Sequence, residues 1–147
     1  MVTAGLIVRR GKMAYLDEIF NAAMGLMDEL DAKGQAQTAD TQEYANRAPY
    51  VVNQMTAEYK LLTGDGEAWA ACEDLEDYVP VDATYALGVM IYGLAANLLT
   101  DENPTAASFY QQRYEEMRNL YINKRRADTG EIENVYGGFE HNEFGRW

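Results

Sequence analysis

Histidine and cysteine are nearly absent from this chain of 147 residues, which contains only His141 and Cys72. A di-metal centre in a helical bundle needs Glu-x-x-His motifs on facing helices, and a single histidine cannot supply them. A Ser-His-Asp or Cys-His arrangement would have to bring His141 to Ser108 or Cys72. A lone cysteine forms no disulfide within the chain, so we expect Cys72 to be a small packed hydrophobic side chain.

Phosphate- and calcium-binding motifs are missing as well. No glycine-rich phosphate loop is present. Residues 64–67 (Gly-Asp-Gly-Glu) begin like a calcium loop but lack its alternating oxygen ligands and its distal glutamate. Clustered carboxylates, such as those in residues 73–77, are most simply solvated surfaces. We therefore expect no catalytic residues, no metal, no cofactor and no enzymatic activity.

Basic residues are scarce. The chain has 12 Lys and Arg against 24 Asp and Glu, which gives a net charge of -12. Between residues 13 and 103 the only basic side chains are Lys33, Arg47 and Lys60, and most of the others lie in residues 113–126. Phosphate backbones and anionic membrane surfaces repel such a protein, so we expect neither specific nucleic-acid binding nor membrane binding.

Long apolar runs are also absent. The longest uncharged stretch, residues 84–100, is short for a membrane span and is interrupted by Tyr92 and Asn97. The short apolar stretch near the amino terminus precedes its positive charges, which is the reverse of a secretion signal. We expect a soluble protein made in a cytoplasm.

Proline occurs only three times, as Pro49, Pro80 and Pro104, which favours long helices. Residues 13–30 have apolar side chains at helical spacing, and so do residues 41–62. Pro49 is expected to kink the second helix or to split it. Asp40 or Thr41 is expected to cap the start of the second helix, Gly64 its end, and Asp82 the start of the next helix.

The second half of the chain predicts two further helices. Residues 65–81 predict an ordered loop, with a short helical turn at most. Residues 83–100 are apolar nearly all round, which predicts the most buried helix, and Gly88 and Gly93 are expected to let a neighbouring helix approach closely. Asn103 is expected to cap the last helix, residues 104–126, which packs antiparallel to its predecessor because the connection is short.

The sequence thus predicts an all-α protein, a bundle of four or more helices with an extended carboxy-terminal tail. Three parts are expected: an arm (residues 1–12), a helical bundle domain (residues 13–126) and a docking tail (residues 127–147). The arm is either disordered or in contact with a neighbouring subunit. The tail has lost the helical period but carries apolar side chains, so it either docks on a partner or folds back over its own bundle. Its expected docking residues are Ile132, Val135, Tyr136, Phe139, Phe144, Arg146 and Trp147.

A known family has a similar pattern in the second half. Residues 85–99 (YALGVMIYGLAANLL), the acidic turn 101–104 (DENP) and residues 107–117 (ASFYQQRYEEM) resemble the head-tail connector (adaptor) proteins of long-tailed bacteriophages. In that family a helix rich in small residues ends in Leu-Leu and an acidic turn, and a helix with a Tyr-Glu pair follows. The resemblance extends over most of residues 13–147 and consists of helix-packing patterns.

The resemblance implies a structural virion protein that forms a ring, twelve-fold in typical cases, between the portal and the tail. Its partners would be further copies of itself, the portal protein and a stopper or tail-completion protein. Double-stranded DNA would pass through the channel without specific binding, and acidic groups around a channel would let it slide. The expected location is the head-tail junction of the virion, after assembly in the host cytoplasm.

Two other functions use the same features. An acidic helical inhibitor, either a DNA mimic or a protein that caps a host enzyme, would have the same charge and need no ring. A helical accessory subunit of an enzyme is a third possibility.

Overall fold

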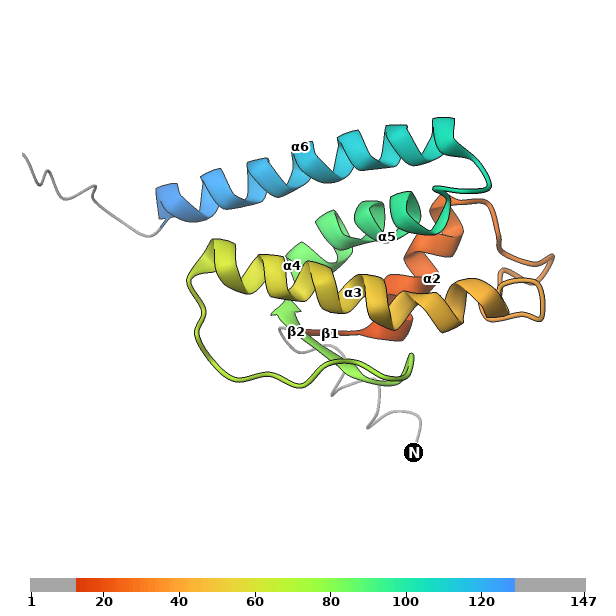
Figure 1. The fold of residues 1–147 in the computed structure, drawn as a ribbon, viewed down its shortest axis with the longest axis horizontal. Helices are drawn as coiled ribbons and strands as arrows, with labels where there is room; N and C mark the ends of the chain where they lie inside the picture. The colour runs from red at the N-terminus through yellow and green to blue at the C-terminus, as the bar shows by residue number, and fades with distance from the viewer. Residues whose placement is uncertain (1–12, 129–147) are drawn as a thin grey trace, which may run out of the picture.

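The computed structural model describes residues 13–128, which form a helical bundle with one small sheet (Figure 1). The expectation of an all-α bundle is confirmed. The elements in chain order are β1 (Met13–Tyr15), α2 (Leu16–Leu26), α3 (Gln42–Thr63), β2 (Tyr78–Asp82), α4 (Ala83–Tyr85), the π-helical segment η1 (Ala86–Met90), α5 (Ile91–Leu98) and α6 (Pro104–Asp128).

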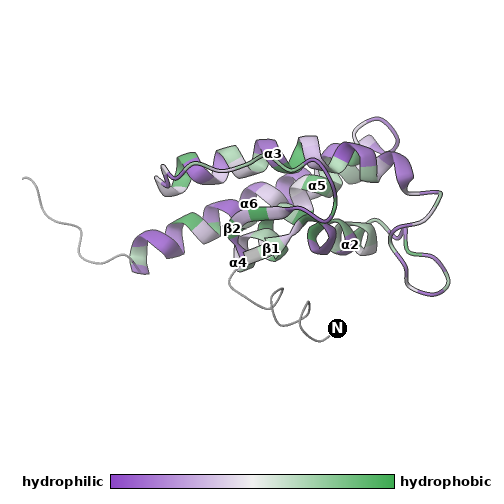
Figure 2. Ribbon diagram, turned by 90° about the horizontal axis from the view of Figure 1, so that it is seen from below, coloured by the Kyte–Doolittle hydropathy of each residue, from purple (hydrophilic) through white to green (hydrophobic). Residues whose placement is uncertain are grey.

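The helical stretch formed by α4, η1 and α5 lies at the centre of the bundle. It packs against α2, α3 and α6, and Tyr85, Met90, Leu94 and Leu98 are fully buried in it. Seen from below, α3 lies along one side of the molecule and α2 lies with the strands along the other (Figure 2). The all-round apolar pattern of residues 83–100 therefore predicted the central helix correctly.

Two strands occur where the sequence pattern predicted none. β1 was expected to be the start of a helix and β2 to be part of a loop, but they pair antiparallel, with Ala14 opposite Val79 and Tyr15 opposite Tyr78. Val79 and Val81 are buried, and the residues between and beside them are more exposed. This alternation is the two-residue period of a strand, which over five residues is too short to stand out in a sequence.

The first helix is shorter than expected. α2 ends at Leu26 instead of residue 30, and Asp28 adopts a left-handed backbone (φ 59°) that turns the chain away. The amides of Met27 and Glu29 donate to carbonyls in the last turn of α2 and thereby close the helix. Leu30, expected on the buried stripe, is 42% exposed.

Pro49 does not split α3, which is one helix from Gln42 to Thr63, so that part of the expectation is wrong. Gly64 ends the helix in a left-handed conformation (φ 69°), as predicted. Thr41 precedes the helix but its side chain does not cap it. Its hydroxyl instead donates to the carbonyl oxygen of Ala36 at 2.6 Å and so closes the preceding loop.

The cap of α6 is present as expected, because the Asn103 side-chain oxygen accepts a hydrogen bond from the amide of Ala106 at 3.1 Å. Replacing Asn103 with alanine leaves that amide without its partner. We expect the free energy of unfolding to fall by about 1 kcal/mol, the usual effect of losing such a cap. Urea denaturation followed by circular dichroism measures the loss. Asn119→Ala, an exposed change inside α6, should leave the stability nearly unchanged.

Candidate functional site

The docking residues expected from sequence, from Ile132 to Trp147, lie outside the residues that the structure describes, as does the arm (residues 1–12). The candidate surfaces described here therefore belong to residues 13–128. They are a groove beside β2 and the outward faces of α3 and α6.

A tyrosine cluster joins three elements next to the groove. The ring of Tyr85 in α4 lies 4.7 Å from that of Tyr59 in α3 and 5.0 Å from that of Tyr121 in α6, measured between ring centroids. The Tyr121 hydroxyl donates to a carboxylate oxygen of Asp82 at 3.0 Å. Asp82 was expected to cap the following helix, but its side chain makes no capping bond there and instead accepts this bond. The cluster thus fixes α6 to the end of β2.

A second polar contact ties α6 to α3. Glu58 accepts hydrogen bonds from the Tyr114 hydroxyl at 2.5 Å and from the Arg118 guanidinium at 3.1 Å. Burial, together with the bond to Glu58, raises the pKa of Tyr114 well above its ordinary value. The side chains of Tyr114, Arg118 and Glu58 are thus committed to holding the two helices together.

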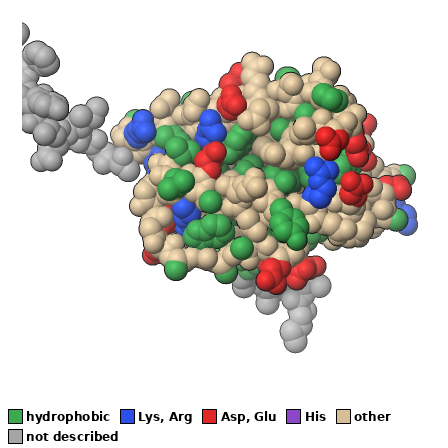
Figure 3. All heavy atoms as spheres, in the orientation of Figure 1, with side chains coloured by type: hydrophobic (Ala, Val, Ile, Leu, Met, Phe, Trp, Pro, Cys, Tyr) green, Lys and Arg blue, Asp and Glu red, His purple; other side chains and the backbone are tan. Residues whose placement is uncertain are grey.

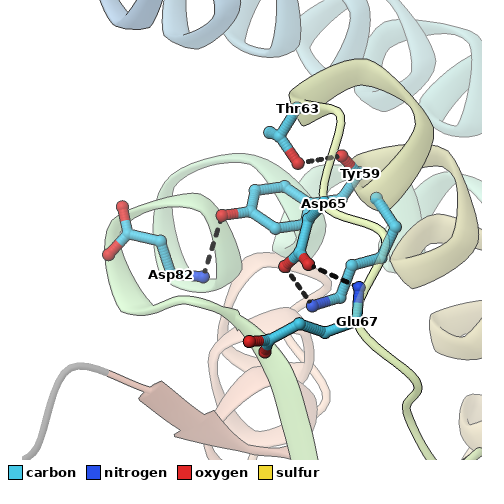
Figure 4. A network of polar contacts seen from close by, with 6 residues as sticks. Tyr59, Thr63, Asp65, Glu67 and Asp82 are labelled. Atoms are coloured by element: carbon cyan, nitrogen blue, oxygen red, sulfur yellow. Dashed lines mark hydrogen bonds and ion pairs between the residues drawn. The ribbon is translucent and has the colours of Figure 1, made fainter. Parts of the chain in front are cut away.

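The groove lies between β2 and the loop that precedes it, and its volume is about 680 Å³. Figure 4 shows the polar contacts at its α3 end. Lys60 donates to Asp65 at 2.6 Å, and the amide of Glu67 donates to the other Asp65 oxygen at 3.0 Å. These bonds, led by the one from Lys60, lower the pKa of Asp65. Asp65 thus organises the turn after α3, and the groove lining is largely acidic and aromatic.

Cys72 borders this region but is not a reactive thiol. Its side chain is buried, as expected, and its backbone is held on both sides by Asn53. Burial, and to a lesser degree the charge of Asp77, raises its pKa to about 11. A thiol with that pKa stays protonated near neutral pH and is a poor nucleophile. Within residues 13–128, no three His, Cys, Asp or Glu side chains are grouped so that they could hold a metal ion.

Large apolar side chains are exposed on two helices. Tyr50 and Leu61 on α3 are 75% and 84% exposed, and Phe109 and Leu120 on α6 are 59% and 61% exposed. The sequence pattern placed Phe109 and Leu120 along the last helix without separating its inward and outward faces. Phe109 and Leu120 are eleven positions apart, which is about three helical turns, so they lie on the same face of the helix. This spacing was the signal that could have revealed a second, outward row.

Charge is unevenly distributed along the same surface. Lys124, Arg125 and Arg126 are exposed at the carboxyl end of α6, and Asp101 and Glu102 are exposed in the turn before that helix. In Figure 3 basic side chains lie near the carboxyl end of α6, and a larger group of acidic side chains lies at the opposite end of this face. α6 therefore has a basic end and begins next to an acidic turn.

Comparison with known protein families, with curated proteins and with solved structures found no match. None of the helices in the described part of the chain has the length and hydrophobicity needed to cross a bilayer.

Proposed function

We propose that this chain is a structural virion protein that forms a ring between the portal and the tail of a bacteriophage and lines the DNA exit channel. The resemblance of residues 85–117 to head-tail connectors suggests this role. The helical hairpin of α5 and α6, joined by the acidic turn 101–103, is consistent with it.

The observation that carries the proposal is the pair of outward apolar rows on α3 and α6. They lie on two different helices that both pack against α5. A subunit with two unlike adhesive surfaces associates head to tail, and such contacts generate rings when the rotation between subunits closes. An enzyme inhibitor of this size would need one such surface.

The acidity of the chain supports the same role. A net charge of -12 gives a surface that repels the phosphate backbone, and a repelling channel lets DNA move without sticking. In this proposal residues 127–147 dock on the portal protein, with Phe144, Arg146 and Trp147 as anchors. A stopper or tail-completion protein would bind the opposite rim.

The test is to mix the full chain with the portal protein of the same phage and to weigh the products by mass photometry. We expect a particle that contains the portal and many copies of the 16.6 kDa chain. Truncation after Arg126 should leave a folded bundle whose affinity for the portal is at least tenfold lower. A tenfold loss of affinity corresponds to about 1.4 kcal/mol of binding free energy.

Two outcomes would contradict this proposal. If the full chain stays a monomer or dimer in the presence of the portal, the inhibitor function becomes the better explanation. If the truncated chain binds the portal as tightly as the full chain, the docking site lies on the helices and the assignment of the tail is wrong.

A further inference from the structure

We infer that the groove beside β2 is the docking site of the chain's own amino-terminal arm, residues 1–12. This contact lies within one copy and does not depend on the proposed connector function. It follows from the charge of the groove, from its apolar lining, and from the point at which the arm joins the described part of the chain.

The groove is acidic beyond what its own ion pair neutralises. Among the described residues, its lining has one lysine, Lys60, and five carboxylates, those of Asp65, Glu67, Glu73, Asp77 and Asp82. Lys60 pairs with Asp65, and the charge of Arg125 in α6 also acts on Asp65, which still leaves an excess of negative charge. A groove of this kind attracts a cationic segment.

Apolar groups lie along the same groove. Trp69 and Pro80 are partly buried in its lining, and Tyr78 is 41% exposed there. Its volume of about 680 Å³ falls within the range of about 300–1,000 Å³ that is typical of sites that bury a ligand. An occupant that matches the groove therefore carries apolar side chains next to its positive charges.

The arm has this composition, and the other terminal segment does not. Residues 1–12 contain Arg9, Arg10 and Lys12 and no Asp or Glu, and the apolar residues 6–8 (Leu-Ile-Val) directly precede the two arginines. The tail, residues 127–147, has five Asp and Glu residues against Arg146, so the acidic groove repels it. Of the two segments outside the described residues, charge selects the arm.

The arm also begins beside the groove. Met13 in β1 lies opposite Asp82 in β2, and Asp82 lines the groove. Paired residues of antiparallel strands have Cα atoms about 4.5–5.5 Å apart, so Lys12 lies within a residue or two of the groove. Gly11 can adopt the backbone conformations of a tight turn, which lets the chain reverse into the groove.

The order of residues in the arm matches the two ends of the groove. At the α3 end, Asp65, Glu67 and Asp82 lie around Tyr59 (Figure 4). The basic residues of the arm, which are nearest to β1, would meet these carboxylates first. At the other end the Cys72 thiol donates to the carbonyl oxygen of Tyr78 at 3.4 Å, which brings the loop and β2 together.

In extended form, residues 6–12 span up to about 23 Å, so the apolar residues 6–8 can reach Trp69 and Tyr78 while the arginines stay near the α3 end. A segment tethered by a short connection has an effective concentration in the millimolar range, so even a weak contact is well populated. The arm of another copy has no such tether.

The fluorescence of Trp69 tests whether the arm covers the groove. The chain has two tryptophans, so in the full chain with Trp147→Phe all of the tryptophan emission comes from Trp69. We expect the covered indole to be poorly accessible to acrylamide, a neutral quencher. Arg9→Glu/Arg10→Glu should release the arm and raise the quenching constant at least twofold, and removal of residues 1–12 should do the same.

Charge exchange tests whether the groove itself holds the arm. Glu67→Arg/Glu73→Arg should release the unchanged arm. Combined with Arg9→Glu/Arg10→Glu, it should bring the quenching constant at least halfway back to that of the unchanged arm and groove. The matched control Glu43→Arg/Asp101→Arg, two exposed changes away from the groove, should neither release the arm nor restore it. Circular dichroism checks that every variant is folded.

Mixing separates the chain's own arm from that of another copy. A chain without residues 1–12 that keeps Trp69 is mixed with a full chain carrying Trp69→Phe/Trp147→Phe. For a contact within one copy, Trp69 should stay as accessible to acrylamide as in the armless chain alone. Protection of Trp69 in the mixture would show that the arm docks on a second copy, and the contact inferred here would be wrong. It would also be wrong if arm reversal left the quenching constant unchanged, or if the control pair restored protection.

Discussion

Replacing Gly93 with alanine should destabilise the bundle, whereas the same replacement at Gly88 should stabilise it. A Cβ atom at Gly93 would lie 2.4 Å from Met55 Sδ and 2.9 Å from Tyr114 Cδ2, distances that force a neighbour to move. The Met55 sulfur can shift, but the Tyr114 hydroxyl is bonded to Glu58, so the ring is held in place. Overpacking of this kind costs about 1–3 kcal/mol. Better helix propensity offsets up to about 1 kcal/mol of that cost.

At Gly88 a Cβ atom would meet no neighbouring atom within 4 Å beyond its own helical backbone and the adjacent residues, so only the gain in helix propensity remains. We expect the free energy of unfolding to rise by up to about 1 kcal/mol for Gly88→Ala and to fall by about 1–2 kcal/mol for Gly93→Ala. Urea denaturation of the two variants side by side measures the difference. A Gly93→Ala protein as stable as the unchanged one would mean that the helices separate at little cost.

A double variant with Met55→Ala tests the cause. Removing the sulfur makes room for the new methyl group, so Gly93→Ala should cost less in the Met55→Ala protein than in the unchanged one. Equal costs in both backgrounds would assign the strain to Tyr114 alone.

The long helices were predictable from the sequence, because the spacing of their apolar residues repeats over several turns. The central helix and α6 follow from apolar spacing over sixteen or more residues and from the cap at Asn103 and Pro104. Gly93 was correctly expected to allow a close approach, but Gly88, with the same expectation, faces open space. Periodicity identifies a helix, yet it does not say which side of that helix meets a neighbour.

What was missed depends on contacts between distant residues. β1 and β2 are three and five residues long and are defined by pairing with each other across the chain. The roles of Asp82 and Thr41 were misjudged for the same reason: their side chains bond to Tyr121 and to Ala36 instead of the nearest helix end. The outward rows on α3 and α6 become evident only after the buried faces are known.

Raising the pH above 10 should destabilise this protein, because buried tyrosines resist losing their protons. Burial raises the pKa of Tyr85 to about 12. It also raises those of Tyr44, Tyr114 and Tyr121 well above the ordinary value near 10, with Glu102 and Glu58 adding to the effect at Tyr44 and Tyr114. In the unfolded chain these hydroxyls ionise near pH 10.

The sign follows from proton binding. Between pH 10 and the folded pKa, the folded state holds protons that the unfolded state has released, so stability falls as pH rises. The stabilisation is fully present below pH 10 and, for Tyr85, is lost as the pH rises toward 12. Each fully shielded tyrosine contributes about 1.4 kcal/mol of loss per pH unit in that window. Tyr85 and Tyr114, which are 0% and 5% exposed, should together cost about 3 kcal/mol by pH 11.

Urea denaturation at pH 8, 10 and 11 measures this loss, and phenylalanine variants isolate its source. Tyr85→Phe removes one titrating group, so the drop in stability between pH 8 and pH 11 should shrink by about 1.4 kcal/mol. Tyr50→Phe, a change at a side chain 75% exposed, should leave the drop unchanged and is the matched control. A protein equally stable at pH 8 and pH 11 would mean that Tyr85 and Tyr114 ionise as readily in the folded state as in the unfolded one. The cluster joining α3, α4 and α6 would then be open to water.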